Sequence, residues 1–312
     1  MGLQLMRGLG ERELGEIRQL EEACRGGGVL DMKLNWEMLQ SRPAAEINDL
    51  LYYEDGRLVG FMGLYLIDPQ GQEIEITAMI HPGYRRRNIG RRLIAEALAL
   101  AAARGVDRIL LITERSSISG SEFAKAMGFR YTVSEYRMKY AAAGLPGVLD
   151  QGIRLRKASP ADQGIITKID ALCFGKAEET DPGAALETVP GISPGDADKA
   201  ETEGFAYGWD ATYAAELEGR IIGKICAVTE NDSGYIFGFG VLPELRNRGY
   251  GRIILRLMVA QLLAANVQTV ILEVATQNER ALHLYQSCGF REVTVYDYYE
   301  ARLSEFLSPN CK

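Results

Sequence analysis

The chain repeats itself, and this duplication limits its architecture more than any other feature of the sequence. Equivalent residues lie 161 positions apart in the two halves: Pro82 and Pro243, Gly90 and Gly251, Gly128-Phe129 and Gly289-Phe290. A chain of 312 residues is also long enough for two domains, each with a core of its own. The repeat therefore predicts two copies of one domain in tandem.

The boundary between the copies is marked by composition. Residues 141–152 contain Ala-Ala-Ala-Gly-Leu-Pro-Gly, which discourages any regular element. We expect a first domain at residues 1–142, a linker at 143–152 and a second domain at 153–312. The second copy carries about fourteen extra residues before its second strand, within an acidic segment at 178–204.

Each copy reads as a strand, one or two helices, three strands, and then helix, strand, helix, strand. Ile254, Met258 and Leu262 recur at helical spacing, and Asn266 is a suitable stop because it tolerates the left-handed conformation. Residues 108–113 and 269–274 are short apolar runs typical of buried strands. The fold class is α/β (α+β), with a mixed, mostly antiparallel sheet flanked by helices in each copy.

Composition excludes several classes of function. The net charge of -7 argues against a nucleic-acid partner, and no apolar stretch is long enough to span a membrane. Without a signal-peptide pattern, we expect a cytoplasmic location. Five cysteines without a C-x-x-C pair, and only two histidines, predict no metal site. Cys24 and Cys173 occupy equivalent positions and are interpreted as buried thiols without chemistry.

A glycine-rich loop, Arg246-Asn247-Arg248-Gly249-Tyr250-Gly251, lies between a strand and a helix. Glycines let the backbone approach a ligand closely, and the free N–H groups of a helix N-terminus attract anions. The loop therefore predicts a site for a phosphate-bearing ligand. The motif is weak on its own and gains weight from the segments around it.

Those segments resemble the GNAT (GCN5-related N-acetyltransferase) superfamily: Val241-Leu242-Pro243-Glu244-Leu245-Arg246 before the loop, then Leu272-Glu273-Val274, Asn278, and Ala281-Leu282-His283-Leu284-Tyr285 ending in Gly289-Phe290. The resemblance implies that the loop between a central strand and helix binds the pyrophosphate of CoA, and that acetyl-CoA is the co-substrate. It assigns CoA binding in the second copy to Phe239, Gly240, Val241, Arg246, Arg248, Gly249, Tyr250, Gly251, Arg252 and Asn278.

Two residues of the second copy match proton-transfer groups of the superfamily. Tyr285 stands where the family often has its general acid, and a phenol is protonated at neutral pH. Together with Tyr285, Glu273 resembles the arrangement in ribosomal-protein alanine N-acetyltransferases, which implies a role as base. The alternatives are that Tyr285 is a core aromatic and Glu273 an ion-paired carboxylate.

The first copy departs from this pattern, since Ala124 replaces the tyrosine, Ile112 the glutamate and Asn88 the first loop glycine. We therefore expect it to be catalytically degenerate, although its resemblance to other family members implies Glu75 as a substitute base. We expect CoA binding to persist there, because asparagine tolerates a positive φ. The residues assigned to it are Ile80, Arg85, Arg87, Asn88, Gly90 and Arg91. A two-domain chain with a silent first copy also resembles mycothiol synthase in architecture, although Tyr235 stands where that enzyme has an acceptor-binding glutamate.

The sequence thus predicts an N-acetyltransferase that transfers an acetyl group from acetyl-CoA to a primary amine, in a ternary complex. The alternatives are a non-catalytic acyl-CoA sensor and a scaffold for protein contacts. Because the acidic segment 178–204 would border the acceptor side, we expect a cationic acceptor, either a polyamine-like or aminoglycoside-like molecule or a peptide N-terminus. The sequence does not specify the oligomeric state.

Overall fold

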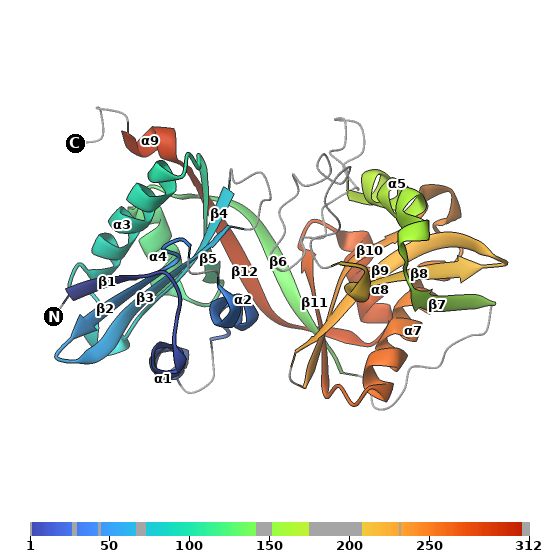
Figure 1. Cartoon of the computed structure of the whole chain (residues 1–312), viewed down its shortest axis with the longest axis horizontal. Coiled ribbons are helices and arrows are strands. Elements are labelled where there is room, and N and C mark those ends of the chain that lie inside the picture. The colour runs from blue at the N-terminus through green and yellow to red at the C-terminus, as the bar shows by residue number, and fades with distance from the viewer. Residues whose placement is uncertain are drawn as a thin grey trace. The chain divides into compact units, whose positions relative to one another are not determined.

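A computed structural model of the chain describes residues 2–26, 30–42, 45–66, 73–141, 152–174, 208–230 and 232–307. The chain forms two compact units, which are described separately (Figure 1). Unit 1 comprises Met1–Val133 and Tyr296–Lys312, and unit 2 comprises Ser134–Val295. Each unit thus holds one copy of the repeat, apart from the last strand.

The last strands of the two copies are exchanged. Strand β6 (Arg130–Tyr140) ends the first copy, but its residues from Glu135 to Lys139 pair with β11 (Thr269–Ala275) of the second copy. Strand β12 (Phe290–Arg302) ends the second copy, and its residues from Tyr296 onward pair with β5 (Arg108–Glu114) of the first copy. The units therefore differ from the consecutive domains expected at 1–142 and 153–312. The proposed linker, apart from Gly152, lies outside the described residues.

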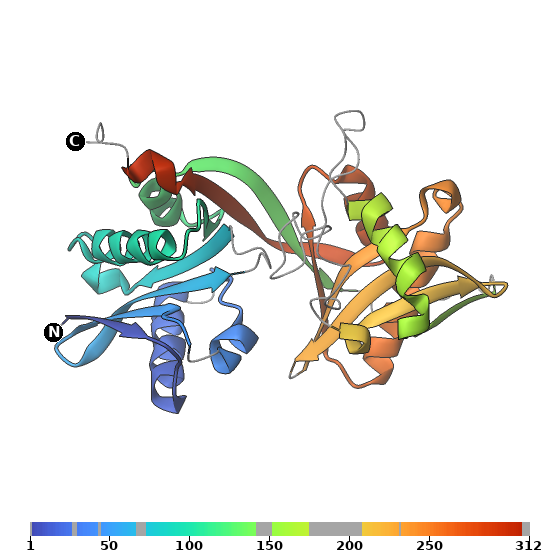
Figure 2. The same cartoon turned by 45° about the horizontal axis from the view of Figure 1, so that its top comes forward.

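Unit 1 is a six-stranded sheet with the order β1-β2-β3-β4-β5-β12, in which only β4 and β5 are parallel. Helix α3 packs on one face of this sheet, and α1 packs on the other, where Glu16 accepts a hydrogen bond from Tyr53 (Figure 2). The remaining elements are β1 (Gly2–Met6), α1 (Glu11–Arg25), α2 (Trp36–Ser41), β2 (Asp49–Glu54), β3 (Arg57–Leu66), β4 (Glu73–Ile80), η1 (Pro82–Tyr84), α3 (Ile89–Ala103), α4 (Ile118–Ala126) and α9 (Leu303–Leu307).

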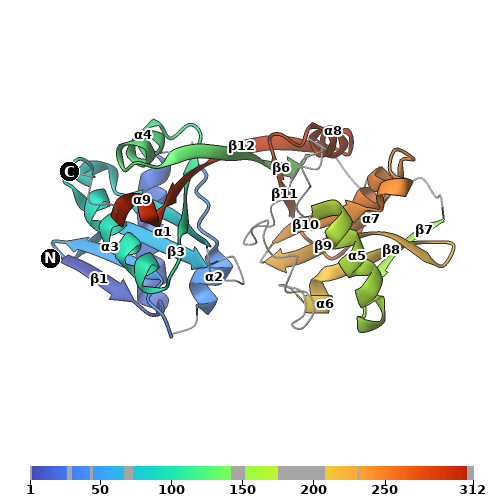
Figure 3. The same ribbon diagram turned by 90° about the horizontal axis from the view of Figure 1, so that it is seen from above.

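Unit 2 repeats this design with the order β6-β11-β10-β9-β8-β7, in which only β10 and β11 are parallel. Helices α7 and α8 cover one face, and α5 packs on the other (Figure 3). The elements are β7 (Ile153–Lys157), η2 (Pro160–Asp162), α5 (Gln163–Phe174), α6 (Gly208–Ala211), β8 (Thr212–Leu217), β9 (Arg220–Glu230), β10 (Ser233–Val241), η4 (Pro243–Leu245), α7 (Tyr250–Ala264) and α8 (Glu279–Ser287).

The apolar spacing read from the sequence reappears as the buried side of α7. Ile254, Met258 and Leu262 face the core of unit 2, and the chain leaves the helix before Asn266, which has a φ of 64°. These positions confirm the predicted helix and its stop signal. The mixed sheets flanked by helices confirm the predicted fold class. Among the described residues, no helix is long and apolar enough to cross a membrane.

Candidate functional site

The site in unit 2 is built where two parallel strands part. Strands β10 and β11 pair from Ser233 and Thr269 as far as Ile236 and Leu272. Beyond this point β10 contains a bulge between Phe237 and Gly240. A bulge bends its strand and disrupts the local ladder. The end of β10 is thereby free to turn away from β11 and to border a cavity.

The glycine-rich loop follows directly. Gly249 has a φ of 83° and stands immediately before α7, so a side chain there would be strained. The carbonyl of Val241 accepts a hydrogen bond of 3.0 Å from Arg246 Nε, which fixes the guanidinium beside the end of β10. Since α7 is fifteen residues long, its free N–H groups and dipole offer an anion site at this loop.

Gly251, the last glycine of the loop, lies beside two apolar side chains. A Cβ at position 251 would lie 3.4 Å from Leu284 and 3.6 Å from Phe239, which is ordinary contact. The protein itself therefore does not demand a glycine there. The space that a larger side chain would fill belongs to the cavity, as expected for close backbone approach to a ligand.

The cavity of unit 2 has a volume of about 540 Å³. It is lined by Cys173, Phe174, Phe239, Gly240, Val241, Leu245, Arg246, Asn247, Gly249, Gly251, Arg252, Asn278, Arg280, Ala281, His283 and Leu284. Eight of the ten residues assigned to CoA binding are among them. Arg248 instead donates to the carbonyl of Glu244, and Tyr250 packs against the core. Sequence reasoning missed Arg280 and His283, which one face of α8 presents to the cavity.

Tyr285 and Glu273 lie on opposite faces of the sheet of unit 2. Tyr285, on α8, is 2% exposed and packs in the core with Leu272 and Val274, with its ring 6.2 Å from that of Phe290. It does not line the described cavity. Glu273 is 8% exposed and is the first residue of β11 beyond the parallel pairing. Because side chains alternate along a strand, Glu273 points away from the face that holds Tyr285.

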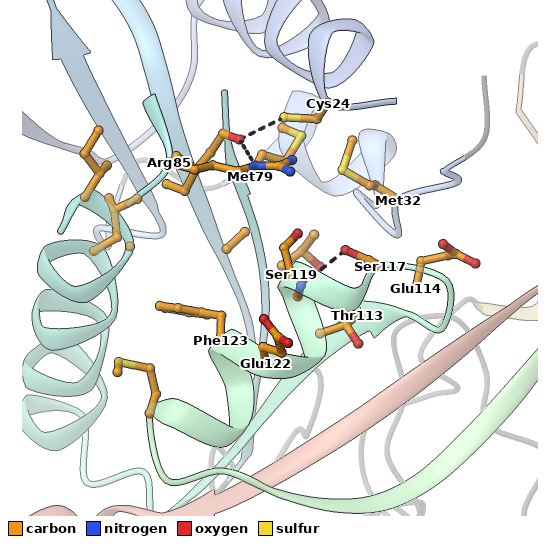
Figure 4. A pocket seen from close by; sticks show the side chains of 18 of the residues that line it. Cys24, Met32, Met79, Arg85, Thr113, Glu114, Ser117, Ser119, Glu122 and Phe123 are labelled. Carbon is orange, nitrogen blue, oxygen red and sulfur yellow. Dashed lines mark hydrogen bonds between the residues drawn. The ribbon is translucent and has the colours of Figure 1, made fainter. Parts of the chain in front are cut away.

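Unit 1 contains an equivalent and larger cavity, with a volume of about 860 Å³ (Figure 4). Five of the six residues assigned to CoA binding line it: Ile80, Arg85, Asn88, Gly90 and Arg91. The sixth, Arg87, instead forms an ion pair of 3.1 Å with Glu54. Asn88 has a φ of 62°, so asparagine does replace the loop glycine in its left-handed conformation.

Polar side chains of unit 1 line the same cavity near α4 (Figure 4). Ser117 caps α4 by accepting a hydrogen bond from the Gly120 amide, as Asn278 caps α8 in unit 2. The hydroxyl of Thr113 is buried and has no hydrogen-bond partner among the described residues. A buried hydroxyl without a partner is costly, so a polar ligand group beside it would be stabilising.

Unit 1 lacks side chains for proton transfer at the positions that correspond to the second copy. Ala124 is fully buried in the core, and Ile112 belongs to an apolar cluster with Tyr296 and Tyr298. Tyr296, which comes from the second copy, also lines the cavity of unit 1. No motif could have revealed this, because the exchange of β12 brings that residue in.

Cys24 and Cys173 share one setting in the two units. Cys24 donates to the carbonyl of Ile80, which Arg85 Nε also contacts at 3.2 Å (Figure 4). Cys173 lies 3.2 Å from Arg246 and donates to the carbonyl of Val241. Burial raises the pKa of the Cys24 thiol, with Arg85 opposing the shift. Cys24 is buried as the sequence predicts, whereas Cys173 is partly exposed, and both line the cavities beside the loops, which the sequence did not indicate.

No cluster of three or more potential metal ligands occurs in the part of the chain that the structure describes. The cavity of unit 2 brings together a helix N-terminus, arginines and the end of β10, while neither Glu273 nor Tyr285 lines it. Such an arrangement can hold a phosphate-bearing ligand along β10 and present a thioester to the parted strands.

Comparison with known proteins gives the same picture. The family described as acetyltransferase (GNAT) matches residues 16–129 and 185–290. The mycothiol acetyltransferase of Thermomonospora curvata is 26% identical over 305 residues, which cover 94% of this chain and 95% of that protein. That of Thermobispora bispora is 29% identical over 257 residues, covering 79% and 81%.

Two solved structures share the fold over nearly the whole chain. A GCN5-related N-acetyltransferase from Sphaerobacter thermophilus has a TM-score of 0.75 at 16% identity and covers 96% of each chain. A tandem GNAT protein from the clavulanic acid biosynthesis pathway has a TM-score of 0.65 at 17% identity and covers 96% of this chain and 98% of that one. At such identities the likeness concerns the fold and its tandem arrangement.

Proposed function

Because this chain belongs to the acetyltransferase (GNAT) family and transfers an acetyl group from acetyl-CoA to an amine, we propose that unit 2 performs the reaction, with Glu273 as base and Tyr285 as acid. The observation that carries this proposal is the position of Glu273. It is the first residue of β11 after the parallel pairing with β10 ends, and β10 itself leads into the loop that offers a phosphate site.

Acetyl-CoA is proposed to lie with its pyrophosphate at the loop before α7 and its pantetheine arm along Phe239 to Val241. Arg246 and Arg252 line the cavity and supply positive charge to the phosphates. The open space beside Gly249, where no protein atom lies within 4 Å of an added Cβ, supports this placement. Asn278 is already engaged in capping α8, which orders the far wall of the cavity.

The proposed chemistry requires two proton movements. The acceptor amine must be neutral to attack, so Glu273 accepts its proton directly or through one water. A bond forms between the amine nitrogen and the acetyl carbon, and the bond from that carbon to sulfur breaks. Tyr285 donates its proton to the departing sulfur and recovers one from solvent.

Unit 1 is proposed to bind CoA without transferring an acetyl group. Its loop keeps the left-handed asparagine and a helix N-terminus, and the hydroxyl of Thr113 fits a polar group of such a ligand. Ala124 and Ile112 leave it without the acid and base of unit 2. Calorimetric titration with CoA should then give two classes of site, and a single class would remove unit 1 from this proposal.

The acceptor is proposed to be a cationic small molecule or peptide N-terminus. The acidic residues that support this lie at 178–204, outside the described residues, so the support comes from the sequence. The relatives named mycothiol acetyltransferase make mycothiol-type amines the first small molecules to test. If the acidic segment attracts the acceptor, the acceptor KM should rise with ionic strength while the acetyl-CoA KM stays nearly constant.

The proposal is tested by measuring thiol release from acetyl-CoA with a panel of amines. Once an acceptor is found, Glu273→Gln should lower kcat and leave acetyl-CoA affinity close to that of the wild type. Wild-type kcat in that variant would exclude Glu273 as the base. Failure of every amine to stimulate thiol release would instead question the acceptor class.

A further inference from the structure

The sheet of unit 2 contains a strand from the other copy next to the proposed base. Strand β6 runs antiparallel beside β11 (Figure 1). Its register places Arg137 directly opposite Glu273. Leu272, Val274 and Met138 face the helix-covered core, so the alternate residues Glu273 and Arg137 share the opposite face. Residues directly opposite on one face have Cβ atoms about 4.5–5.5 Å apart, and pairs of opposite charge interact favourably.

The burial of Glu273 makes its pairing with a cation important, because an unpaired charge would be costly there. Glu273 is 8% exposed, and an ionised carboxylate at such depth is costly unless a cation or donors accompany it. On the same face of β6, Glu135 lies opposite Ala275, and Lys139 lies opposite Ile271. Arg137 is therefore the cationic residue that the register brings to Glu273. A guanidinium holds a carboxylate in a defined orientation, because its donors are fixed in a plane.

The duplication supplies an internal comparison. In unit 1 the residues equivalent to Glu273 and Arg137 are Ile112 and Tyr298, which are likewise direct partners across β5 and β12. Both belong to an apolar cluster there, and the hydroxyl of Tyr298 accepts a hydrogen bond of 2.5 Å from Lys33. The carboxylate and its cross-strand cation are thus either present together or replaced together. This paired replacement supports a shared role for the two residues.

We propose that Arg137, which the first copy supplies through β6, is a positioning residue for Glu273. This inference rests on the proposed role of Glu273 as base. Arg137 holds the carboxylate in one orientation on its face of β11 and keeps its charge in place, while it exchanges no proton itself. The first copy, although it lacks its own acid and base, thereby contributes to the chemistry of the second.

The test uses the full chain and a coupled pair of substitutions. Arg137→Gln should lower kcat about tenfold with the acetyl-CoA KM unchanged, and Arg137→Lys should recover most of that loss because it restores the charge. Lys139→Gln is the matched control, since it removes a positive charge from the same face of the same strand, opposite Ile271. Its kcat should equal that of the wild type.

The decisive comparison is made in the Glu273→Gln background. If Arg137 acts through Glu273, adding Arg137→Gln there should cause no further loss of kcat. Independent, multiplying losses, or an Arg137→Gln variant as active as Lys139→Gln, would overturn the inference. If the thermal melt shows that Arg137→Gln alone does not fold, the comparison uses the double variant, in which both charges are absent. Its kcat should then equal that of Glu273→Gln.

Failure of the proposed function gives a different pattern. Wild-type kcat in Glu273→Gln would remove the base and overturn the role of Arg137 with it. A slow Glu273→Gln variant combined with independent losses would leave the base in place and overturn only the inference about Arg137.

Discussion

Substituting Met138 by alanine tests whether the last strands are exchanged. Met138 belongs to the first copy by sequence, yet it is fully buried in the core of unit 2, opposite Leu272. Truncating a buried methionine to alanine costs about 2–5 kcal/mol, because transfer free energy is lost and a cavity remains. The free energy of unfolding of unit 2 should fall by that amount, whereas unit 1 should change little.

Hydrogen exchange of the backbone amides resolves the two units. A loss of about 2–5 kcal/mol corresponds to exchange roughly thirtyfold to a few thousandfold faster, and we expect it in β9 and β10 but not in β2 and β3. The matched variant is Tyr299→Ala, since Tyr299 is the equivalent residue of the second copy and is buried in the core of unit 1. It should give the reverse pattern. Faster exchange of β2 and β3 in Met138→Ala would refute the exchange of strands.

Three further predictions concern binding, chemistry and pH. Gly251→Val should weaken CoA binding at unit 2 at least tenfold by calorimetry, because its branched side chain would take up room that the backbone leaves for the ligand. A thermal melt checks that the variant still folds, since its Cβ would already lie 3.4 Å from Leu284. Unchanged affinity in the folded variant would contradict the loop assignment. Tyr285→Phe should lower kcat roughly ten- to a thousandfold at constant acetyl-CoA affinity, and wild-type kcat would exclude Tyr285 as the acid. Burial raises the pKa of Asp49 to about 6, against the opposing charge of Arg42. Its folded pKa therefore exceeds its ordinary value, so the stability that Asp49 contributes is present below about pH 4 and is lost as pH rises through 6. Denaturant titrations of Asp49→Asn should no longer show this fall in stability between pH 4 and 6. If the fall persists in the variant, another group causes it.

The sequence was sufficient for the fold of each copy because its signals are local. Helical spacing placed α7, and the tolerance of asparagine for positive φ anticipated the conformation of Asn88. The phosphate loop was likewise readable from its glycines. All of these features depend on residues close together in the chain.

Partner choice between strands was not readable. The last strands of the two copies occupy equivalent places in the repeat, and nothing in the pattern of β6 or β12 says which copy's sheet each one joins. The exchange changes the site, because Arg137 faces Glu273 and Tyr296 lines the cavity of unit 1. The sequence also does not show why each of the positions 90 and 251 is a glycine. A Cβ at Gly90 would meet Phe123 at 2.9 Å, whereas a Cβ at Gly251 would make only ordinary contacts.

We propose that acetyl transfer takes place in unit 2 through Glu273 and Tyr285. The most direct measurement is kcat for amine-dependent thiol release by the double variant Glu273→Gln, Tyr285→Phe, with acetyl-CoA affinity measured on the same sample. We expect a fall of at least about a hundredfold in kcat with affinity unchanged. Wild-type turnover in the double variant would contradict it and place the chemistry outside these residues.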